Sequence, residues 1–352
     1  MDIFAAMDGL GHEEVVFHRD TATGVRMIVA VHSSALGPAL GGTRWRPYAS
    51  EAEALEDVLR LSSAMTAKSA AAGLPFGGGK AAVIGDPAAK TPEQLRAYGR
   101  FIDSLNGRYI TTTDVGTTTA EIDQIANETR FVVGTSPEQG GSGDTSVLTA
   151  VTIMNGMRAA MRVAFDDESF AGKRIAVVGV GKVGSRVARQ IAEQGAELIL
   201  SDIRTDAAET LAKELGATTT ALDGAYQTEC DILSPNALGG ILTPETIPTL
   251  RCRVVCGGAN NQLAHDPADA QLLKERGIVY APDYVINSGG VISVAVEFEG
   301  FDTARADQLA DAVYDTTLRV LRSAESDGIS TAEAAARLVQ ERLAGGRTEH
   351  PN

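Results

Sequence analysis

Two lysines, Lys68 and Lys80, stand at the ends of the segment KSAAAGLPFGGGK and are the side chains best suited to chemistry. In one small site, one ammonium can hold a carboxylate by its charge, while burial and the neighbouring charge lower the pKa of the other. An amine whose pKa lies near neutrality suits a general base. The pair therefore favours acid–base chemistry on an anionic substrate, although Lys68 could also extend along its stem to water.

Lys68 should lie on a helix. Ser50 and Glu53 have the spacing of a capping box at its start, and Gly73 is a natural stop. Between them, apolar residues at three- and four-residue spacing predict the buried face of this helix, namely Leu55, Val58, Leu59, Leu61, Ala64 and Met65. Lys68 continues the same spacing, so its ammonium starts from the apolar face.

Lys80 follows three glycines, residues 77–79, and leads into an apolar strand at residues 81–84. We expect the glycines in a loop whose missing side chains let a ligand approach the backbone, although they could form only a tight turn. A later strand, residues 109–112, ends just before Asp114, where an α/β sheet presents functional side chains. From its local sequence alone, Asp114 could instead cap the next helix.

A second chemical motif is the G-x-G-x-x-G segment at residues 179–184, which lies between a predicted strand and a predicted helix. In a dinucleotide fold these glycines let a pyrophosphate reach the helix N-terminus, and an acid about 20 residues later binds the ribose hydroxyls. Asp202 ends the next predicted strand and fits that acid. Its carboxylate would repel a 2′-phosphate, which favours NAD over NADP, although Arg204 is a cation nearby.

The composition is that of a globular enzyme. The 352 residues suffice for two domains, and the net charge of −15 without a basic block disfavours nucleic acid or an anionic membrane as partner. The sequence has no run of about 18 apolar residues and starts with an acidic segment, so we expect a cytoplasmic protein. We expect the three cysteines, Cys230, Cys252 and Cys256, to be reduced thiols and not zinc ligands.

These patterns predict an α/β protein of two domains separated by a cleft: an N-terminal α/β substrate domain and a Rossmann-type NAD-binding domain. The glycine-rich segment at residues 140–143 suits the boundary, which gives domains at residues 1–141 and 142–327. The other expected elements are a hairpin at 14–20 and 25–32, a loop at 37–45, helices from 91, at 145–161, at 185–194 and after 287–290, strands at 175–178, 197–200, 231–233, 253–256 and 278–281, and two helices within 303–343.

Four motifs in combination resemble one known family: GPALGGTR at residues 37–44, Lys68, LPFGGGK at 74–80 and TTDVGTT at 112–118. The chain is similar to the glutamate, leucine, phenylalanine and valine dehydrogenases over nearly its whole length, and closest to the leucine, valine and phenylalanine branch. The resemblance implies reversible NAD-dependent oxidative deamination of an L-amino acid to a 2-oxo acid and ammonia, without a metal, in a homo-oligomer. It also implies that a C-terminal helix, about residues 328–352, packs back on the first domain.

The resemblance further implies roles for individual residues. Lys80 would be the general base that activates water, and Lys68 would bind the α-carboxylate. Asp114 would relay a proton at the amino group and touch the cofactor, Asn260 would contact both substrate and cofactor, and Arg44 would lie near the cofactor. The remaining implied cofactor residues are Thr149, Gly179, Val180, Gly181, Lys182, Val183, Gly184, Ser185, Asp202, Ile203, Asn236, Ala237 and Ala259.

Leu40 indicates the substrate side chain, because the glutamate-specific branch carries a lysine at this position to pair with the side-chain carboxylate. With Gly41, Thr112, Val291 and Val294 it predicts an apolar pocket, in which a glutamate side chain would lack a partner. We therefore expect Leu, Val or Ile as substrate, with Phe as the alternative.

Two other functions remain open from the residues alone. One is a metal-dependent, decarboxylating two-domain NAD oxidoreductase, which the absence of a clustered acidic ligand set disfavours. The other is a nucleotide-binding protein without catalysis, which the presence of both Lys80 and Asp114 disfavours.

Overall fold

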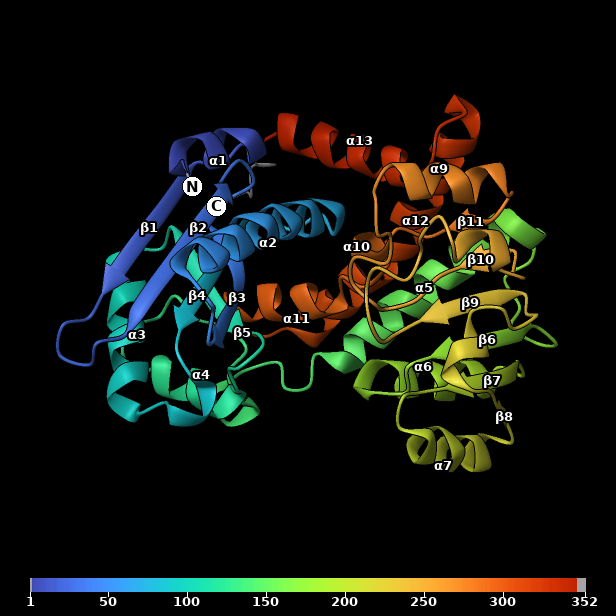
Figure 1. Ribbon diagram of the computed structural model, residues 1–352, viewed down its shortest axis with the longest axis horizontal. Helices are drawn as coiled ribbons and strands as arrows, with labels where there is room; N and C mark the ends of the chain where they lie inside the picture. The colour runs from blue at the N-terminus through green and yellow to red at the C-terminus, as the bar shows by residue number, and fades with distance from the viewer. Residues whose placement is uncertain (1, 347–352) are drawn as a thin grey trace. The chain divides into compact units, whose positions relative to one another are not determined.

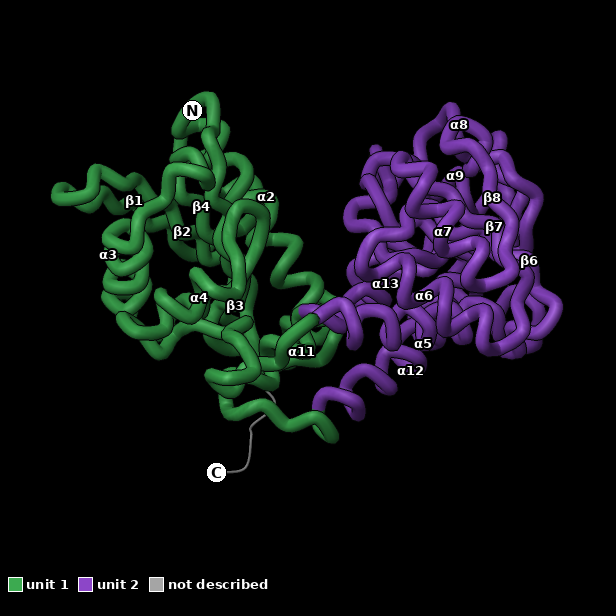
Figure 2. Tube along the Cα trace, turned by 90° about the horizontal axis from the view of Figure 1, so that it is seen from below, with its two compact units in different colours: residues 1–144, 291–305, 339–352 green, residues 145–290, 306–338 purple. Residues whose placement is uncertain are grey.

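The computed structural model describes residues 2–346 and divides into two compact units. Unit 1 comprises Met1–Asp144, Val291–Arg305 and Val339–Asn352, and unit 2 comprises Thr145–Gly290 and Ala306–Leu338 (Figure 2). Each unit contains one β-sheet with helices packed on it. The chain is therefore a two-unit α/β protein. The last residues of the expected C-terminal helix, 347–352, lie outside the described residues.

Unit 1 contains a five-stranded mixed sheet in the order β1-β2-β4-β3-β5. Its strands are β1 (Glu14–Arg19), β2 (Arg26–Ser33), β3 (Ala39–Arg46), β4 (Gly77–Ile84) and β5 (Tyr109–Thr113). The first two strands form the predicted hairpin, and β2 also pairs antiparallel with β4. The other two pairings, β3 with β4 and β3 with β5, are parallel, so these three strands end at the same edge.

Helices cover both faces of this sheet (Figure 1). Helix α2 (Glu51–Ala71) packs on one face against Ile28, Ala30 and Ala82, and α1 (Ile3–Leu10) adds side chains to the same core. Helices α3 (Pro92–Ser104) and α4 (Thr119–Ile125) pack on the other face against the alternate strand residues. The two cores follow from the alternation of side chains along a strand. Helix α3 begins at the predicted position, where Thr91 and Gln94 form a capping box.

The two glycine-rich segments expected in loops are strands, so that prediction is wrong. Gly77, Gly78 and Gly79 are the first residues of β4, and most of the 37–45 segment is β3. The reason is steric. A Cβ on Gly78 would lie 2.1 Å from the backbone nitrogen of Thr66 in α2, and one on Gly77 would lie 1.9 Å from the Ser33 carbonyl oxygen. The glycines therefore let a helix and neighbouring backbone approach β4 and are not a ligand-binding loop.

This close approach also corrects the predicted face of α2. Leu55, Val58 and Leu59 are buried as expected, but Ala64 is exposed and the buried face continues through Ser62, Thr66 and Ser69. Small side chains fit there because the glycines of β4 hold the helix close to the sheet. Leu61, Met65 and Lys68 are only partly buried.

The ends of α2 match the prediction in part. The Ser50 hydroxyl accepts the backbone N–H of Glu53 at 3.1 Å, and Gly73 adopts a φ of +68° just past the last helical residue. The reciprocal half of the capping box is missing. The Glu53 carboxylate accepts from the backbone of Ala49 and from Arg46.

Unit 2 contains a six-stranded sheet in the order β11-β10-β9-β6-β7-β8, in which every pairing is parallel. Its strands are β6 (Arg174–Val178), β7 (Glu197–Ser201), β8 (Thr218–Thr219), β9 (Ile232–Pro235), β10 (Val254–Val255) and β11 (Val279–Tyr280). Counted from β6, the spatial order is 3-2-1-4-5-6, which is the Rossmann arrangement with its switch point between β6 and β9. Only β8 was not predicted, because its two residues are exposed threonines and carry no apolar pattern.

The helices expected at 145–161, at 185–194, after 287–290 and within 303–343 are all present, and four further helices between residues 205 and 286 were not predicted. In chain order, the helices are α5 (Ser146–Phe165), α6 (Lys182–Ala192), α7 (Thr205–Leu215), α8 (Leu222–Ala225), α9 (Ala268–Glu275), α10 (Asp283–Ile286), α11 (Gly289–Glu297), α12 (Thr303–Asp327) and α13 (Thr331–Ala344). Among residues 2–346, no helix has the length and apolar content to cross a membrane.

Two segments belong to a different unit from the one expected. The structure places 291–305 in unit 1, and it divides the expected returning helix at Val339, whose C-terminal part alone belongs to unit 1. Glu297 explains the first difference, because its carboxylate accepts the backbone N–H groups of Gly134, Thr135 and Ser142. Arg342 explains the second, since it donates to two carbonyls at the end of α2.

We predict that Gly78→Ala destabilises the protein by about 2–3 kcal/mol, because the added methyl group overlaps α2 and forces it away from β4. The midpoint of urea unfolding, followed by circular dichroism, should fall. Gly9→Ala in α1 is the matched control, since a Cβ there meets nothing within 4 Å. Equal midpoints for the two variants would contradict this account of the glycine strand.

Candidate active site

Lys80 and Asp114 form the centre of a charged cluster in unit 1. The Lys80 ammonium lies 2.6 Å from Asp114 Oδ2, and the Lys80 side chain is only 8% exposed. Lys80 is in the middle of β4 and Asp114 follows the last residue of β5, so the sheet itself sets the contact. Asp114 does not serve as the N-cap of the next helix, because Thr118 holds that position.

Burial and charge shift the pKa of both groups. Burial lowers the pKa of the Lys80 ammonium, and the Asp114 carboxylate opposes part of that effect. Burial also works against ionisation of Asp114, but the Lys80 ammonium and the Arg44 guanidinium outweigh it and lower the pKa of Asp114 to about 2. Lys80 is therefore a buried ammonium that can lose its proton, and it lies beside a carboxylate that remains ionised.

Arg44 extends the cluster across β3. Its Nε donates to Asp114 Oδ2 at 2.9 Å, and its Nη1 donates to both carboxylate oxygens of Asp57 at 3.0 Å. Asp57 also accepts the hydroxyl of Tyr48 at 2.9 Å. The sequence analysis placed Arg44 near the cofactor and missed Asp57 and Tyr48. The acidic position within the α2 pattern was the only available signal for Asp57.

The sheet register shows which predicted residues share the face that carries Lys80. On β3, Leu40 pairs with Gly78, the glycine that faces α2, and on β5 Thr112 pairs with Gly42. By strand alternation, Leu40 and Thr112 therefore lie on the same face as Lys80. Leu40 is fully buried, and the buried Thr112 hydroxyl has no hydrogen-bond partner. Gly41 has the opposite orientation, and its carbonyl accepts the Tyr109 hydroxyl.

The remaining predicted substrate residues of unit 1 lie on two helices. Lys68 is partly buried near the end of α2, two residues after Thr66, whose backbone touches β4. Val291 and Val294 are buried on α11. Unit 1 thus contains every predicted substrate-binding residue except Asn260.

The glycine loop of unit 2 has the geometry of a dinucleotide cradle. Gly179 has a φ of +97°, and a Cβ on Gly184 would lie 1.9 Å from the Gly179 carbonyl oxygen. In contrast, a Cβ on Gly181 would meet nothing within 4 Å, so the space above this residue is open. These are the three glycine roles of the fold: a tight turn, room for the pyrophosphate, and close packing of helix on strand.

The residues around the loop complete the cradle. Helix α6 begins at Lys182 without a side-chain cap, so the N–H groups of its first turn, which includes Val183 and Ser185, can meet an anion. Val180 donates its backbone N–H to the Asp202 carboxylate at 2.7 Å. The acid predicted for the ribose therefore lies directly beside the loop.

Asp202 is ionised and structurally fixed. Partial burial works against its ionisation, but the backbone N–H groups of Arg204 and Val180 outweigh that effect and lower the pKa of Asp202. The Arg204 guanidinium lies 3.7 Å from the same carboxylate, and its side chain is mostly exposed. Ile203 is 82% exposed at the same edge.

Other predicted cofactor residues follow β9 and β10. Asn236 accepts the backbone N–H of Gly258 at 2.9 Å, so the loops that contain Ala237 and Ala259 are tied together. Asn260 accepts from the Asn287 side chain at 2.9 Å. Thr149 is on α5, where its hydroxyl donates to the Thr145 carbonyl. All these residues belong to unit 2.

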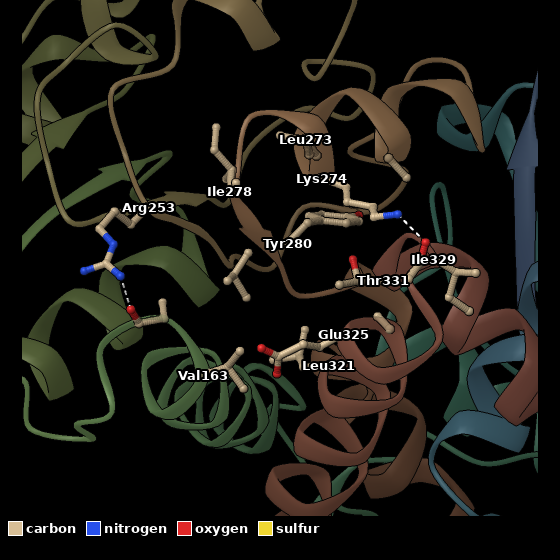
Figure 3. A pocket seen from close by; sticks show the side chains of 16 residues that line it. Val163, Arg253, Leu273, Lys274, Ile278, Tyr280, Leu321, Glu325, Ile329 and Thr331 are labelled. Atoms are coloured by element: carbon tan, nitrogen blue, oxygen red, sulfur yellow. Dashed lines mark hydrogen bonds between the residues drawn. The ribbon is translucent and has the colours of Figure 1, made fainter.

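A separate cavity of about 430 Å³ in unit 2 contains none of the predicted site residues (Figure 3). Its Lys274 donates to the Gly328 carbonyl, and its Arg253 donates to the Ala164 carbonyl. Arg253 and Ile278 each precede a strand, so the cavity lies at the amino ends of β10 and β11. A Rossmann sheet binds its ligand at the carboxyl ends, so this cavity is not the cofactor site.

The fold and the two sites define a class: an oxidoreductase with a dinucleotide-binding Rossmann unit and a second unit that carries a buried lysine–aspartate pair. Comparison with known proteins then gives the family. Residues 12–131 match the family model described as "Glu/Leu/Phe/Val dehydrogenase, dimerisation domain", and residues 200–348 match "Glutamate/Leucine/Phenylalanine/Valine dehydrogenase".

Individual relatives agree with this assignment. A valine dehydrogenase of Streptomyces albus is 48% identical over 96% of this chain and 93% of the relative, and a leucine dehydrogenase of Geobacillus stearothermophilus is 48% identical over 97% and 94%. The crystal structure of L-tryptophan dehydrogenase from Nostoc punctiforme has a TM-score of 0.88 at 39% identity and covers 97% of this chain and 98% of that chain. The chain belongs to the glutamate, leucine, phenylalanine and valine dehydrogenase family, and it is an NAD(P)-dependent amino acid dehydrogenase.

We predict that Gly181→Ala weakens NADH binding at least about tenfold, because the methyl group fills the open space where the pyrophosphate approaches. Fluorescence titration with NADH measures the effect. Stability should not change, since the added Cβ meets no protein atom within 4 Å. Gly224→Ala, on α8 of the same unit, is the control and should bind like the parent; tight NADH binding by Gly181→Ala would contradict the cradle.

Proposed function

We propose that this enzyme uses NAD to deaminate branched-chain L-amino acids reversibly, with Leu, Val and Ile as its best substrates. The products are the 2-oxo acid and ammonia. The buried Lys80 and Asp114 pair carries the proposal, because it supplies a base beside a fixed carboxylate in the unit that also contains the buried apolar side chains of Leu40, Val291 and Val294.

The pair has a direct role in the chemistry. The glycine loop at residues 179–184 and Asp202 would hold NAD, which would supply the acceptor for the hydride of the amino acid Cα. Water must then attack the resulting imine. Lys80 takes the proton from that water, since burial lowers the pKa of its ammonium and so favours the neutral amine. Asp114, ionised at rest, relays a proton at the substrate nitrogen, which leaves as ammonia when the carbinolamine collapses to the 2-oxo acid. Lys68 holds the α-carboxylate by charge.

Leu40 supports an apolar substrate side chain. It is fully buried on the face of the sheet that carries Lys80, where the glutamate-specific branch has a lysine. Thr112, Val291 and Val294 are also buried in unit 1 and add no charge. A glutamate side chain would lose its hydration there without a partner. Relatives named valine and leucine dehydrogenase agree with branched-chain substrates, and phenylalanine is the alternative.

Asp202 supports NAD over NADP. Its carboxylate is ionised and fixed to the glycine loop by the Val180 N–H, at the strand end where the ribose hydroxyls bind. A 2′-phosphate at that position would meet a negative charge. Arg204 is 65% exposed and offers a weaker, flexible counter-charge.

We also propose a homo-oligomer in the cytoplasm. The family model that matches residues 12–131 is described as a dimerisation domain. Cys230, Cys252 and Cys256 are free thiols, which supports a reducing compartment.

Replacement of the two lysines should separate chemistry from binding. We predict that Lys80→Ala lowers kcat by about 10²–10⁴ while NADH binding stays at the parental level. Lys68→Ala should instead raise KM for the amino acid about 10–100-fold, because the α-carboxylate loses a charge-assisted partner. Steady-state kinetics with L-leucine and NAD, with NADH titration as control, measure both effects.

Activity of Lys80→Ala within about threefold of the parent would remove Lys80 from the role of base. An unchanged KM in Lys68→Ala would show that Lys68 extends to solvent and does not bind the carboxylate.

A substrate panel tests the assignment of Leu40 and Asp202. We expect kcat/KM for L-Leu, L-Val and L-Ile to exceed that for L-Phe, L-Glu to be essentially inert, and NAD to be preferred to NADP. Initial rates of NADH or NADPH formation measure all of these values.

A higher kcat/KM for L-Phe than for both L-Leu and L-Val would overturn the ranking, and appreciable turnover of L-Glu would remove Leu40 from the pocket. A preference for NADP would make Arg204 the residue that reads the ribose.

A further inference from the structure

We propose that Asp57 is a positioning residue for catalysis: it holds Arg44, and through Arg44 it fixes the Asp114 carboxylate against Lys80. This inference rests on the proposed role of Lys80. Asp57 itself is on α2 and makes no hydrogen bond or ion pair with Lys80 or Asp114, so it positions Asp114 through the arginine and reaches Lys80 by its charge alone.

The geometry of Arg44 carries the argument. Its Nε donates to Asp114 and its Nη1 donates to both oxygens of Asp57, so two different nitrogens of one planar group are held by two carboxylates. A guanidinium held at both positions cannot rotate out of its plane without losing a charge-assisted hydrogen bond. Arg44 and Lys80 both contact the same atom, Asp114 Oδ2. The orientation of the Arg44 plane therefore fixes where that oxygen lies relative to the ammonium.

Asp57 is itself well fixed. Its side chain is only 12% exposed, and the Tyr48 hydroxyl donates to its Oδ2 at 2.9 Å. Arg60 also contacts Asp57, but the Arg60 side chain is 57% exposed, and such a pair contributes little. The contact from α2 to β3 through Asp57 and Arg44 is thus rigid and largely buried.

The same four side chains also balance one another in charge. Lys80 and Arg44 are cations and Asp114 and Asp57 are anions, so the partly buried cluster is neutral as a group. The charged groups around Lys80 are Asp114 after β5, Arg44 on β3 and Asp57 on α2, and α2 also carries Lys68. The residue of β2 paired with Lys80 is Ala30, which has no charge. Arg44 lowers the pKa of Lys80 and Asp57 raises it, so loss of Asp57 leaves the effect of the arginine uncompensated.

The test is the pH profile of kcat for oxidative deamination in the parent, in Asp57→Asn and in Glu53→Gln. Asn keeps the size of the side chain and one acceptor oxygen, and loses the charge. We expect Asp57→Asn to lower kcat about tenfold or more through misplacement of Asp114. We also expect its acid limb to move to lower pH by about 0.5–1 unit, since Lys80 then loses its proton more easily.

Glu53→Gln is the matched control. Glu53 pairs with Arg46 at 2.5 Å and so also joins α2 to β3, but this pair does not reach Asp114. It should leave kcat and the pH profile unchanged. An Asp57→Asn enzyme with the parental kcat and profile would overturn the proposal, and so would an equal shift in Glu53→Gln, because the effect would then be general to helix packing.

Arg44→Lys keeps the inference testable if Asp57→Asn does not fold. Lysine retains the charge but cannot hold two carboxylates with a rigid fork, so kcat should fall about tenfold or more while KM for NAD stays the same. A change confined to KM for NAD would show that Arg44 serves the cofactor and would overturn the proposal. Lys80→Ala in the same assay distinguishes failure of the proposed function from failure of this inference. If Lys80→Ala stays active, both fail. If Lys80→Ala is inactive while Asp57→Asn behaves like the parent, only the inference about Asp57 fails.

Discussion

The close contact between helix α2 and the glycine strand β4 is the constraint on which unit 1 depends. Without a side chain at Gly78, the backbone of Thr66 can approach the sheet, and the helix face there is limited to Ser62, Thr66 and Ser69. This contact covers the face of β4 from which Lys80 projects, so the ammonium is buried. It also brings Asp57, on the first half of the same helix, within hydrogen-bond distance of Arg44 on β3. One steric fact therefore produces both the burial that lowers the pKa of Lys80 and the charges that surround it.

Much of the fold was predictable because its signals are local. The hairpin, the Thr91 capping box, the strand before Asp114 and the strand–loop–helix around Gly179 each depend on neighbouring residues, and the structure contains all of them. The glycine run before Lys80 was assigned to a loop because glycine has the same weak local preference in a turn and in a crowded strand. Only the position of α2, set by tertiary packing, distinguishes the two. The prediction that Ala64 lies on the buried face of α2 was wrong for the same reason, because tertiary packing decides which face is buried.

Long-range contacts also explain the parts of the site that sequence reasoning missed. Asp57 resembles an ordinary solvent-facing acid within an amphipathic helix, and its partners Arg44 and Tyr48 are not at helical spacing from it. The segment with Val291 and Val294 follows the Rossmann strands in the chain, yet the Glu297 carboxylate binds three backbone N–H groups between Gly134 and Ser142. Neither contact leaves a periodic pattern. Motifs therefore point to the residues that we propose to react, whereas the residues proposed to orient them are found from geometry.

The neutral charge balance of the cluster explains how unit 1 can bury the Lys80 ammonium and still let it lose its proton, as the proposed role of base requires. An isolated buried cation would cost several kcal/mol or would simply lose its proton, and a single tight carboxylate partner would hold the proton too firmly for exchange. Arg44 resolves this conflict, because it shares Asp114 Oδ2 with Lys80 and so weakens the hold of that carboxylate on the ammonium. Asp57 then limits the effect by compensating Arg44 from the other side. Lys80 is thus one of four alternating charges from one unit: the two carboxylates raise the pKa of its ammonium, whereas burial and Arg44 lower it.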